Sequence, residues 1–335
     1  MIFIFIYFYM LGLVILEEKI KIKKKVRVFL SSFPLICLIL FIKRIADYEM
    51  YERFYINPNL PNHFEVGYNY ISNFFYKIGL SYHSYRVIIL LIVLYCFSKR
   101  IFKIKEVCFS YFVLYIYTFI IVCLIQYRSG ISLILLVFGV YFLQKKKYLM
   151  FLFMIYIAGK FHSSIIVFIP IIFLKNLKSR RWKLILGVGV FLLPFCIKYL
   201  YPFIEIAVLK GIKYFPQLWK LNYYIENFSF NFSYSVKDLL NILLFLILSF
   251  EGKYLTKEEK EDYDIYIWIF YLGIFYRSLF LGVTEIGFRL MILGQSTLFL
   301  VVLPLMRKYK NIKFLFCILS FFILISWLTA YTGIL

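Results

Sequence analysis

Residues 107–125 read VCFSYFVLYIYTFIIVCLI, a run of nineteen residues without a charged side chain. An α-helix needs about 20 predominantly apolar residues to cross the hydrocarbon core of a bilayer, so this stretch is predicted to span a membrane. The basic segment Lys99–Lys105 comes just before it, and Gln126-Tyr127-Arg128 comes just after it. The rest of the chain repeats this pattern of apolar stretch and polar border.

The composition fits a chain that lies in a membrane throughout. Of its 335 residues, 63% are hydrophobic and only 17% are charged. A water-soluble core needs more polar surface to cover it, so a separate soluble domain is not expected. The six cysteines fall in apolar stretches without a C-x-x-C pair, which predicts neither a disulfide framework nor a metal site. We expect an all-α, polytopic integral membrane protein, with one membrane domain over residues 1–335.

The apolar stretches predict about 10–12 transmembrane helices. They are residues 1–16, 26–43, 85–98, 107–125, 130–144, 148–160, 164–174, 184–200, 236–250, 264–282, 287–306 and 314–332. Several of them, 148–160 and 164–174 above all, are short for a bilayer. Two interpretations remain open for these. They are tilted spans of a thin membrane, or residues 148–174 include a re-entrant or broken helix that neighbouring helices shield from lipid.

The linking segments alternate in charge, and every second one is short and basic. These basic segments are Glu17–Arg27, Lys99–Lys105, Lys145–Lys147, Lys175–Lys183, Glu251–Asp262 and Arg307–Lys313. They hold 25 of the 39 lysine and arginine residues. The positive-inside rule places them in the cytoplasm, with both chain ends outside. The net charge of +22 therefore lies at membrane borders, which indicates contact with anionic lipids rather than with nucleic acid.

Two longer linking segments, residues 44–84 and 201–235, are predicted to lie on the outer face. In the first, Asp47 is placed to N-cap a short helix through Tyr48–Tyr55. Its second half has apolar and aromatic residues at helical spacing, which predicts a helix in the outer interface. These residues are Gly67, Tyr68, Ile71, Phe74, Phe75 and Ile78. The second segment is rich in aromatic residues, Trp219 among them, which either stack on sugar rings or anchor the chain at the interface.

Three polar motifs stand at the outer ends of predicted helices. Arg128 lies where the topology needs no basic residue, so it either clamps a phosphate with its forked donors or snorkels to the interface. Gln126 stands beside it, and Gly130 leaves room for a close approach. His162 is either a proton donor and acceptor near neutral pH or an interfacial ring, and Ser163 or Ser164 is placed to N-cap the helix that follows.

The third motif contains Glu285 and Arg289. Their spacing of four residues suits an ordinary ion pair within one helix, whereas a charge inside the membrane boundary is usually functional. Asp47 and Glu65 are the two carboxylates that could serve as the base of a glycosyl transfer. The topology, which other residues determine, places five of these polar residues on the outer face: Asp47, Glu65, Arg128, His162 and Arg289.

The order of these motifs resembles the EpsG family over about residues 40–300. These are integral membrane proteins of bacterial exopolysaccharide and capsule clusters, related to Wzy-type polymerases. The motifs that carry the resemblance are Asp47-Tyr48 with Tyr51, Phe64-Glu65-Val66-Gly67-Tyr68, Gln126-Tyr127-Arg128-Ser129-Gly130-Ile131, Phe161-His162-Ser163-Ser164 and Gly287-Phe288-Arg289-Leu290. Where this chain has Ile125-Gln126-Tyr127-Arg128, the family commonly has an Ile-Arg-Gln-like sequence.

The resemblance implies polymerisation of lipid-linked oligosaccharide repeat units on the outer face of the bacterial cytoplasmic membrane. A chain on undecaprenyl diphosphate would be transferred to a new repeat unit. Asp47 or Glu65 would act as base, Arg128 and Arg289 would face the diphosphate, and His162 would relay a proton or contact a sugar. The further substrate-binding residues implied are Gln126, Tyr68 and Trp219. No cofactor or metal is implied, and the expected partners are membrane lipids and the flippase and chain-length regulator of the same pathway.

Two other functions remain open. A multi-spanning glycosyltransferase that uses a polyprenyl-phosphate sugar would also place an acidic residue in an early outer loop, which Asp47 or Glu49 would supply. A flippase for lipid-linked oligosaccharides would need charges in the middle of its helices. The predicted helix centres are almost free of ionisable residues, which disfavours the flippase.

Overall fold

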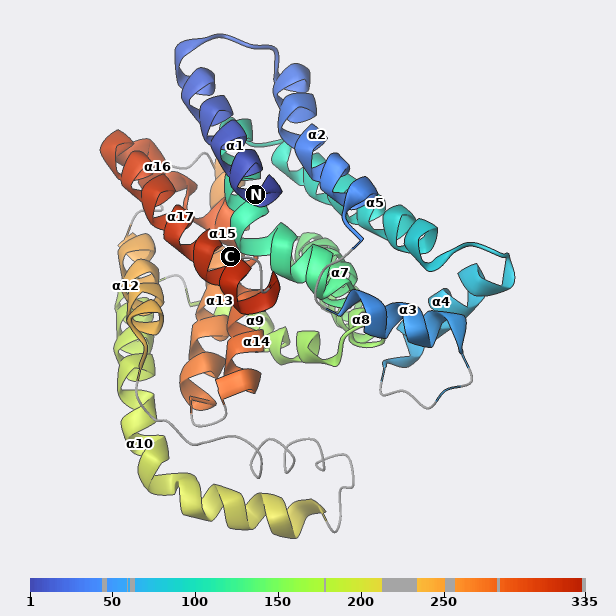
Figure 1. The fold of residues 1–335 in the computed structure, drawn as a ribbon. Helices are drawn as coiled ribbons and strands as arrows, with labels where there is room; N and C mark the ends of the chain where they lie inside the picture. The colour runs from blue at the N-terminus through green and yellow to red at the C-terminus, as the bar shows by residue number, and fades with distance from the viewer. Residues whose placement is uncertain are drawn as a thin grey trace. The chain divides into compact units, whose positions relative to one another are not determined.

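The computed structural model describes residues 1–43, 47–58, 60, 64–177, 179–212, 234–250, 257–281 and 284–332. This part of the chain is built from helices, as predicted (Figure 1). It divides into two compact units, and each is described by itself. Unit 1 contains Met1–Ile172 and Leu298–Leu335, and unit 2 contains Phe173–Thr297. The prediction of a single membrane domain stays a prediction.

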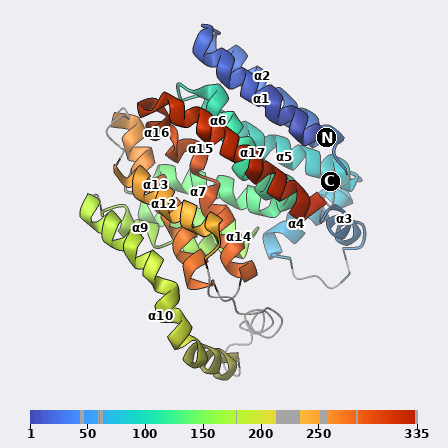
Figure 2. The same cartoon turned by 60° about the vertical axis from the view of Figure 1, so that its left-hand side comes forward.

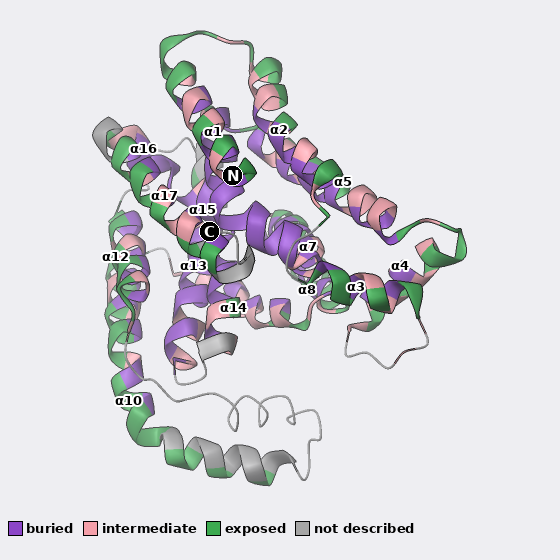
Figure 3. Ribbon diagram, viewed as in Figure 1, coloured by how far each residue is buried: buried purple, intermediate pink, exposed green. Residues whose placement is uncertain are grey.

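Unit 1 is arranged around a buried central helix. Its α-helices are α1 (Ile2–Lys19), α2 (Lys24–Phe41), α3 (Tyr48–Ile56), α4 (Val66–Lys77), α5 (Tyr82–Ile101), α6 (Val107–Leu114), α7 (Tyr127–Gln144), α8 (Tyr148–Gly159), α15 (Leu298–Val301), α16 (Leu303–Lys308) and α17 (Lys310–Thr332). Helix α6 packs against α1, α2 and α15. Its residues and those that follow it to Ile125 are all buried, because other helices of the unit surround them (Figure 3).

The central stretch, predicted as one α-helix over 107–125, is α-helical only at its beginning. From Tyr115 to Ile125 it is a π-helix, η1, and the Gln126 amide donates to the carbonyl of Ile121, five residues back, at 2.8 Å. π-Helical turns are rare and occur frequently at functional sites. Here the wider helix ends directly before Arg128.

The segment 148–174 is broken, as one of its two interpretations expected. Helix α8 is followed by a 3-10 helix, η2 (Ser163–Phe168), and by a single turn, α9 (Ile171–Leu174). The predicted helix 164–174 corresponds to the short apolar helix Ser163–Leu174, which is 3-10 helical at its beginning. Pro170 lies between the two pieces and cannot donate a backbone hydrogen bond, which accounts for the break.

The two short helices predicted in segment 44–84 are present. Figure 1 shows α3 and α4 at the end of α5 away from the turn that joins α1 to α2. The expected cap of α3 is wrong, because the Asp47 side chain makes no capping hydrogen bond and its backbone is left-handed, with φ 65°. The carboxylate of Asp47 is thus not used to begin the helix.

The basic segments of unit 1 gather at one end of it. The ion pairs recorded there, each with an N–O distance of 2.7 Å, are Arg27–Glu17, Arg307–Glu106 and Lys313–Glu18. Arg27 also donates to the carbonyl of Lys105. Tyr141, near the end of α7, lies within electrostatic range of Lys103 and Lys147. The segments that the sequence assigns to one side of the membrane therefore lie together within this unit.

Unit 2 is formed by α10 (Arg180–Ile212), α12 (Val236–Phe250), α13 (Lys257–Leu279) and α14 (Thr284–Gln295). Helices α10, α12 and α13 pack side by side (Figure 2). Helix α10 runs past the predicted 184–200 and contains Pro194 and Pro202, so the beginning of the predicted outer loop 201–235 is helical. Helices α13 and α14 cross at Gly273 and Gly294, where an added Cβ on either residue would meet the other at less than 3 Å.

The predicted helix 287–306 is interrupted after Gln295. The hydroxyls of Ser296 and Thr297 donate to the carbonyls of Leu293 and Gly294, three residues back. Such side-chain bonds compete with the helical hydrogen bonds of the backbone. Helix α16 then begins with Pro304 in its first turn, a position that suits proline.

The basic segments of unit 2 also share one end of it. Lys183 pairs with Asp264 at 3.2 Å, and Arg180 donates to the carbonyl of Phe250. These contacts join the beginning of α10 to the end of α12 and the beginning of α13, next to the segments Lys175–Lys183 and Glu251–Asp262. In each unit, the described parts of the basic segments that alternate along the sequence thus lie at the same end.

Within the described residues, three helices are long and apolar enough to cross a membrane by length and composition, or four if a broken pair is counted as one span. They are Val107–Ile125, Tyr127–Gln144 and Arg180–Leu200, and the broken pair is Ile286–Gln295 with Leu298–Lys308. The shorter apolar helices include α8. The class of an all-α polytopic membrane protein is confirmed. The predicted number of 10–12 spans stays a prediction.

We expect a cysteine at position 70 to be labelled, and one at position 146 to be protected, when intact cells meet a membrane-impermeant thiol reagent. Tyr70 lies on α4 and is 77% exposed, whereas Lys146 lies between α7 and α8 in a basic segment. The variants Tyr70→Cys and Lys146→Cys are made in a chain whose native cysteines are replaced. Labelling at position 146 but not at position 70 would show that the predicted orientation in the membrane is wrong.

Candidate functional site

An arginine, a glutamate and a tyrosine from three separate elements meet in unit 1. Nη1 of Arg128, in the first turn of α7, lies 2.5 Å from Oε2 of Glu65, which precedes α4. Nε of Arg128 donates to the hydroxyl of Tyr51 on α3 at 3.0 Å. The side chains of Arg128 and Glu65 are only 16% and 17% exposed. The ion pair is therefore mostly buried but remains partly accessible to water.

The other oxygen of Glu65 holds the turn between α8 and η2. Oε1 accepts hydrogen bonds from the amide of Ser163 at 3.2 Å and from its hydroxyl at 3.3 Å. Nδ1 of His162 lies 3.7 Å from the same oxygen. The predicted N-cap role of Ser163 is thus wrong, because its hydroxyl is used by Glu65 and no side chain caps η2.

A glycine allows these two turns to approach each other. The amide of Gly67 donates to the carbonyl of Lys160 at 2.8 Å, and a Cβ at Gly67 would lie 2.8 Å from that carbonyl oxygen. Any larger residue would push α4 away from the turn that carries His162. Gly130 packs closely against η1, since a Cβ there would lie 3.2 Å from the carbonyl oxygen of Val122, and its predicted role in the approach of a ligand stays a prediction.

Aromatic rings surround the guanidinium of Arg128. Its central carbon lies 4.4 Å from the ring centre of Phe64, 5.3 Å from that of Tyr51 and 5.6 Å from that of Tyr68. A cation over an aromatic face is stabilised electrostatically, most of all where water is scarce. The hydroxyls of Tyr68 and Tyr127 share a hydrogen bond behind this cluster. The rings therefore fix the plane in which the guanidinium lies.

The donors of Arg128 are only partly used. A guanidinium carries five N–H groups. Two hydrogen bonds from this one are recorded, to Glu65 and Tyr51, and within the described residues the other three N–H groups have no recorded acceptor. The site thus offers a fixed cation with donors to spare, which is the arrangement that phosphate oxygens favour.

Tyr51 remains a neutral hydroxyl in this setting. Burial raises the pKa of Tyr51 above its ordinary value, while the nearby Arg128 acts in the opposite direction. Its oxygen accepts from Arg128, and the part of the chain that the structure describes records no acceptor for its own proton. Asp47, one helical turn before Tyr51, is exposed and lies within electrostatic range of it.

The structure thus brings together Glu65, Arg128, His162 and Tyr68 of the predicted site residues, with Asp47 near Tyr51 at the edge. Gln126 forms the turn between η1 and α7, and no hydrogen bond of its side chain to this cluster is recorded. Arg289 lies in unit 2, exposed, near the beginning of α14. Trp219 lies outside the described residues, and so does the side chain of Glu285.

Arg86 is a buried cation that sequence reasoning missed. It is 1% exposed, and it donates to the carbonyls of Ile42 at 2.9 Å and Leu124 at 3.4 Å. These carbonyls lie at the ends of α2 and η1, where the partial negative charge of a helix favours a cation. Arg86 therefore holds the end of η1 just before Arg128. Its position in the first turn of the predicted helix 85–98 was the available signal.

The helices of membrane-spanning length define the class of a polytopic membrane protein, and the Arg128–Glu65 pair lies at the beginning of α7, away from the basic segment that follows its end. The chain belongs to the EpsG family, whose family model matches residues 26–334. EpsG is a Wzy-type polymerase family, so the chain is a membrane protein of the polysaccharide-polymerase type. Comparisons with curated proteins and with solved structures found no match.

Proposed function

We propose that this protein polymerises oligosaccharide repeat units carried on undecaprenyl diphosphate, at the outer face of the bacterial cytoplasmic membrane. The observation that carries the proposal is the guanidinium of Arg128, which keeps three N–H groups for a ligand. Membership of the EpsG family supports the polysaccharide part of the proposal. The cation at the site supports a diphosphate as the leaving group. A planar, permanently charged donor suits a leaving group whose negative charge grows during the reaction.

In the proposed reaction, a hydroxyl oxygen of the new repeat unit forms a bond to C1 of the growing chain. The bond between C1 and the phosphate oxygen breaks, and undecaprenyl diphosphate leaves with the electron pair. Arg128 stabilises that charge, and the proton of Tyr51 is available for a further phosphate oxygen. Arg289 stays the second proposed cation. The proton of the attacking hydroxyl passes to a carboxylate.

The two carboxylates proposed as base differ in exposure, since Asp47 is exposed and Glu65 is half-buried. Both oxygens of Glu65 already accept hydrogen bonds, Oε2 from Arg128 and Oε1 from Ser163. Asp47 is exposed and is not used as a helix cap. Glu65 is better suited to orienting Arg128, and His162 to relaying a proton or contacting a sugar beside it.

We expect cells that lack this protein, or that carry Asp47→Asn, to accumulate complete, outward-facing repeat units that are not polymerised. Assembly and flipping of the units do not depend on a polymerase, so the lipid-linked pool should be complete. Mass spectrometry of that pool, with and without an external glycosidase, measures both properties. Glu49→Gln, which alters another exposed carboxylate of α3, is the matched control and should leave polymer length unchanged.

Truncated repeat units, short by one sugar, would instead identify a glycosyltransferase that uses a polyprenyl-phosphate sugar. Complete units that the glycosidase cannot reach would identify a flippase. Either result would overturn the proposal. Normal polymer in Asp47→Asn, together with unpolymerised units in the deletion strain, would keep the polymerase and remove Asp47 as its base.

A further inference from the structure

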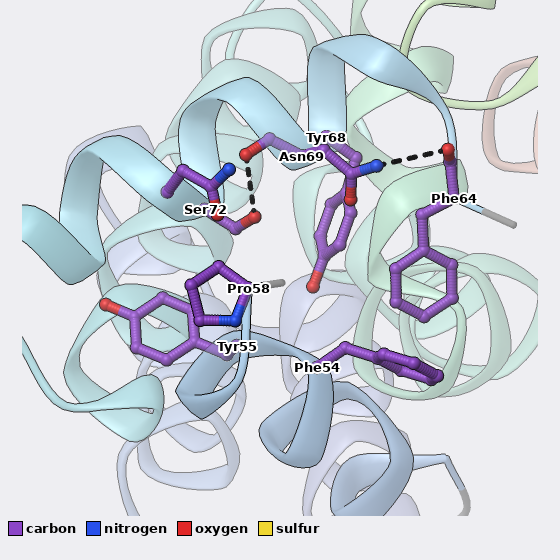
Figure 4. Close-up of a pocket in the computed structure, with 8 residues that line it drawn as sticks. Phe54, Tyr55, Pro58, Phe64, Tyr68, Asn69 and Ser72 are labelled. Carbon is purple, nitrogen blue, oxygen red and sulfur yellow. Dashed lines mark hydrogen bonds between the residues drawn. The ribbon is translucent and has the colours of Figure 1, made fainter. Parts of the chain in front are cut away.

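A small cavity lies between α3 and α4, beside the Arg128 site. It has a volume of about 100 Å³ and is lined by Phe54, Tyr55, Pro58, Phe64, Tyr68, Asn69, Ser72 and Asn73. Figure 4 shows Phe54 and Phe64 on one side of it, Tyr55 and Pro58 on the other, and Asn69 and Ser72 above. Pockets for drug-sized ligands measure roughly 300–1,000 Å³, and a cavity of about 150 Å³ takes benzene. This partly open cavity is therefore too small for an oligosaccharide, and a single sugar ring would enter it only in part.

The lining matches the chemistry of a neutral, polyhydroxylated ring. Four of the eight lining residues are aromatic, three others carry an amide or an aliphatic hydroxyl, and none is charged. Aromatic faces pack against the C–H bonds of a sugar, while amides exchange hydrogen bonds with its hydroxyls. The lining contains no leucine, isoleucine or valine, the residues that a polyprenyl chain would favour. A phosphate would find no cation among these residues.

The polar side of the cavity is partly fixed and partly available. Nδ2 of Asn69 donates to the carbonyl of Phe64 at 3.3 Å, and the hydroxyl of Ser72 donates to the carbonyl of Asn69 at 3.0 Å. These bonds hold the first turns of α4 in place. The amide of Asn73, one turn further along, has no hydrogen bond recorded in the described structure, so it can both donate to a ligand and accept from it.

Two aromatic rings lie between the cavity and Arg128, and they contact both. Phe64 and Tyr68 line the cavity, and the guanidinium of Arg128 lies 4.4 Å and 5.6 Å from the centres of the same two rings. Their centres are 5.1 Å apart and their planes nearly perpendicular. A ligand in the cavity would therefore be about one ring away from a group bound by Arg128. This distance suits two parts of one substrate molecule.

We propose that the cavity binds one sugar ring, the ring that is joined directly to the diphosphate of the lipid-linked substrate. The inference rests on the function proposed above, because Arg128 must hold the diphosphate for the two positions to belong to one ligand. Phe54 and Phe64 would face the ring, and Asn73 would bind one of its hydroxyl or acetamido groups. Asn73 is thus a residue that determines which sugar is accepted.

The test uses the full-length protein in lipid nanodiscs and separate probes for the two positions. Saturation-transfer NMR measures binding of free glucose, galactose, mannose and their N-acetylated 2-amino forms, and calorimetry measures binding of inorganic diphosphate. At least one monosaccharide should bind the unaltered protein. Asn73→Leu should weaken its binding at least tenfold and leave diphosphate binding unchanged. Phe54→Leu, which removes one aromatic face, is the second variant and should also weaken sugar binding.

Tyr70→Leu alters an exposed residue of the same helix outside the cavity and should leave both ligands unaffected. Arg128→Lys should weaken diphosphate and leave the free sugar unaffected. Three results would overturn the inference if diphosphate binding is intact. The variants Asn73→Leu and Phe54→Leu bind the sugar as tightly as the unaltered protein, farnesol displaces the sugar, or the unaltered protein binds no sugar. Absence of diphosphate binding by the unaltered protein would instead count against the proposed function and, with it, the inference.

Discussion

Arg128→Lys should abolish polymer formation almost as completely as Arg128→Ala, by about 10²–10³-fold in rate, because removal of one positioned donor from a site of developing charge has an effect of that order. Lysine keeps the positive charge and can pair with Glu65, so the protein should remain folded and abundant. It cannot donate to Glu65 and Tyr51 at the same time and still present a planar set of N–H groups to a phosphate. Polymer length on gels, normalised to protein abundance, measures the effect.

Arg53→Lys is the matched control, since Arg53 is an exposed arginine on α3, the helix that carries Tyr51. It should leave polymer length unchanged. Near-normal polymer in Arg128→Lys would show that Arg128 serves as an anchor at the interface rather than as a ligand for phosphate. The same pair of substitutions at Arg289 examines the second proposed cation, and loss of polymer in Arg289→Ala but not in Arg289→Lys would indicate a simple point charge.

Sequence patterns were sufficient where the determining interactions are local. The spacing of Tyr68, Ile71 and Phe75 predicts α4, because residues three and four apart share one face of a helix. The outer-face assignment of five residues likewise predicts that they belong to one site; they are Asp47, Glu65, Arg128, His162 and Arg289. Three of these residues do meet in unit 1. Alternating charge was enough to bring them to the same side.

Contacts between distant helices could not be obtained in this way. Ser163 has the sequence signal of a helix cap, yet its hydroxyl donates to Glu65, which is 98 residues earlier. Arg86 is a border arginine by sequence, whereas the fold buries it against the carbonyl of Leu124. Which side chains face each other depends on how the helices pack, and periodicity within each helix does not determine that. The π-helical form of η1 likewise has no signal in its uniformly apolar sequence.

The second large effect is expected in unit 2, where Asp238 and Arg277 form a buried ion pair. Nε and Nη2 of Arg277 donate to the two carboxylate oxygens of Asp238 at 2.9 Å and 3.0 Å. The Ser235 amide and hydroxyl donate to the same carboxylate at 3.1 Å and 2.8 Å, and the Ser235 hydroxyl in turn accepts from the Asp238 amide, so the beginning of α12 is capped reciprocally. Asp238 is only 3% exposed.

We expect Asp238→Leu to lower the free energy of unfolding by about 3–5 kcal/mol, because it leaves the charge of Arg277 buried without its carboxylate. The double variant Asp238→Leu/Arg277→Met should recover most of that loss, since a buried ion pair replaced by apolar residues of similar size is often neutral. Denaturant unfolding of the purified protein in detergent measures both. Glu49→Leu, which removes an exposed carboxylate of α3, is the control and should change the free energy of unfolding by about 0.5 kcal/mol or less. A double variant as unstable as the single one would show that the pair stabilises unit 2 through its own attraction rather than through the penalty of an unpaired charge.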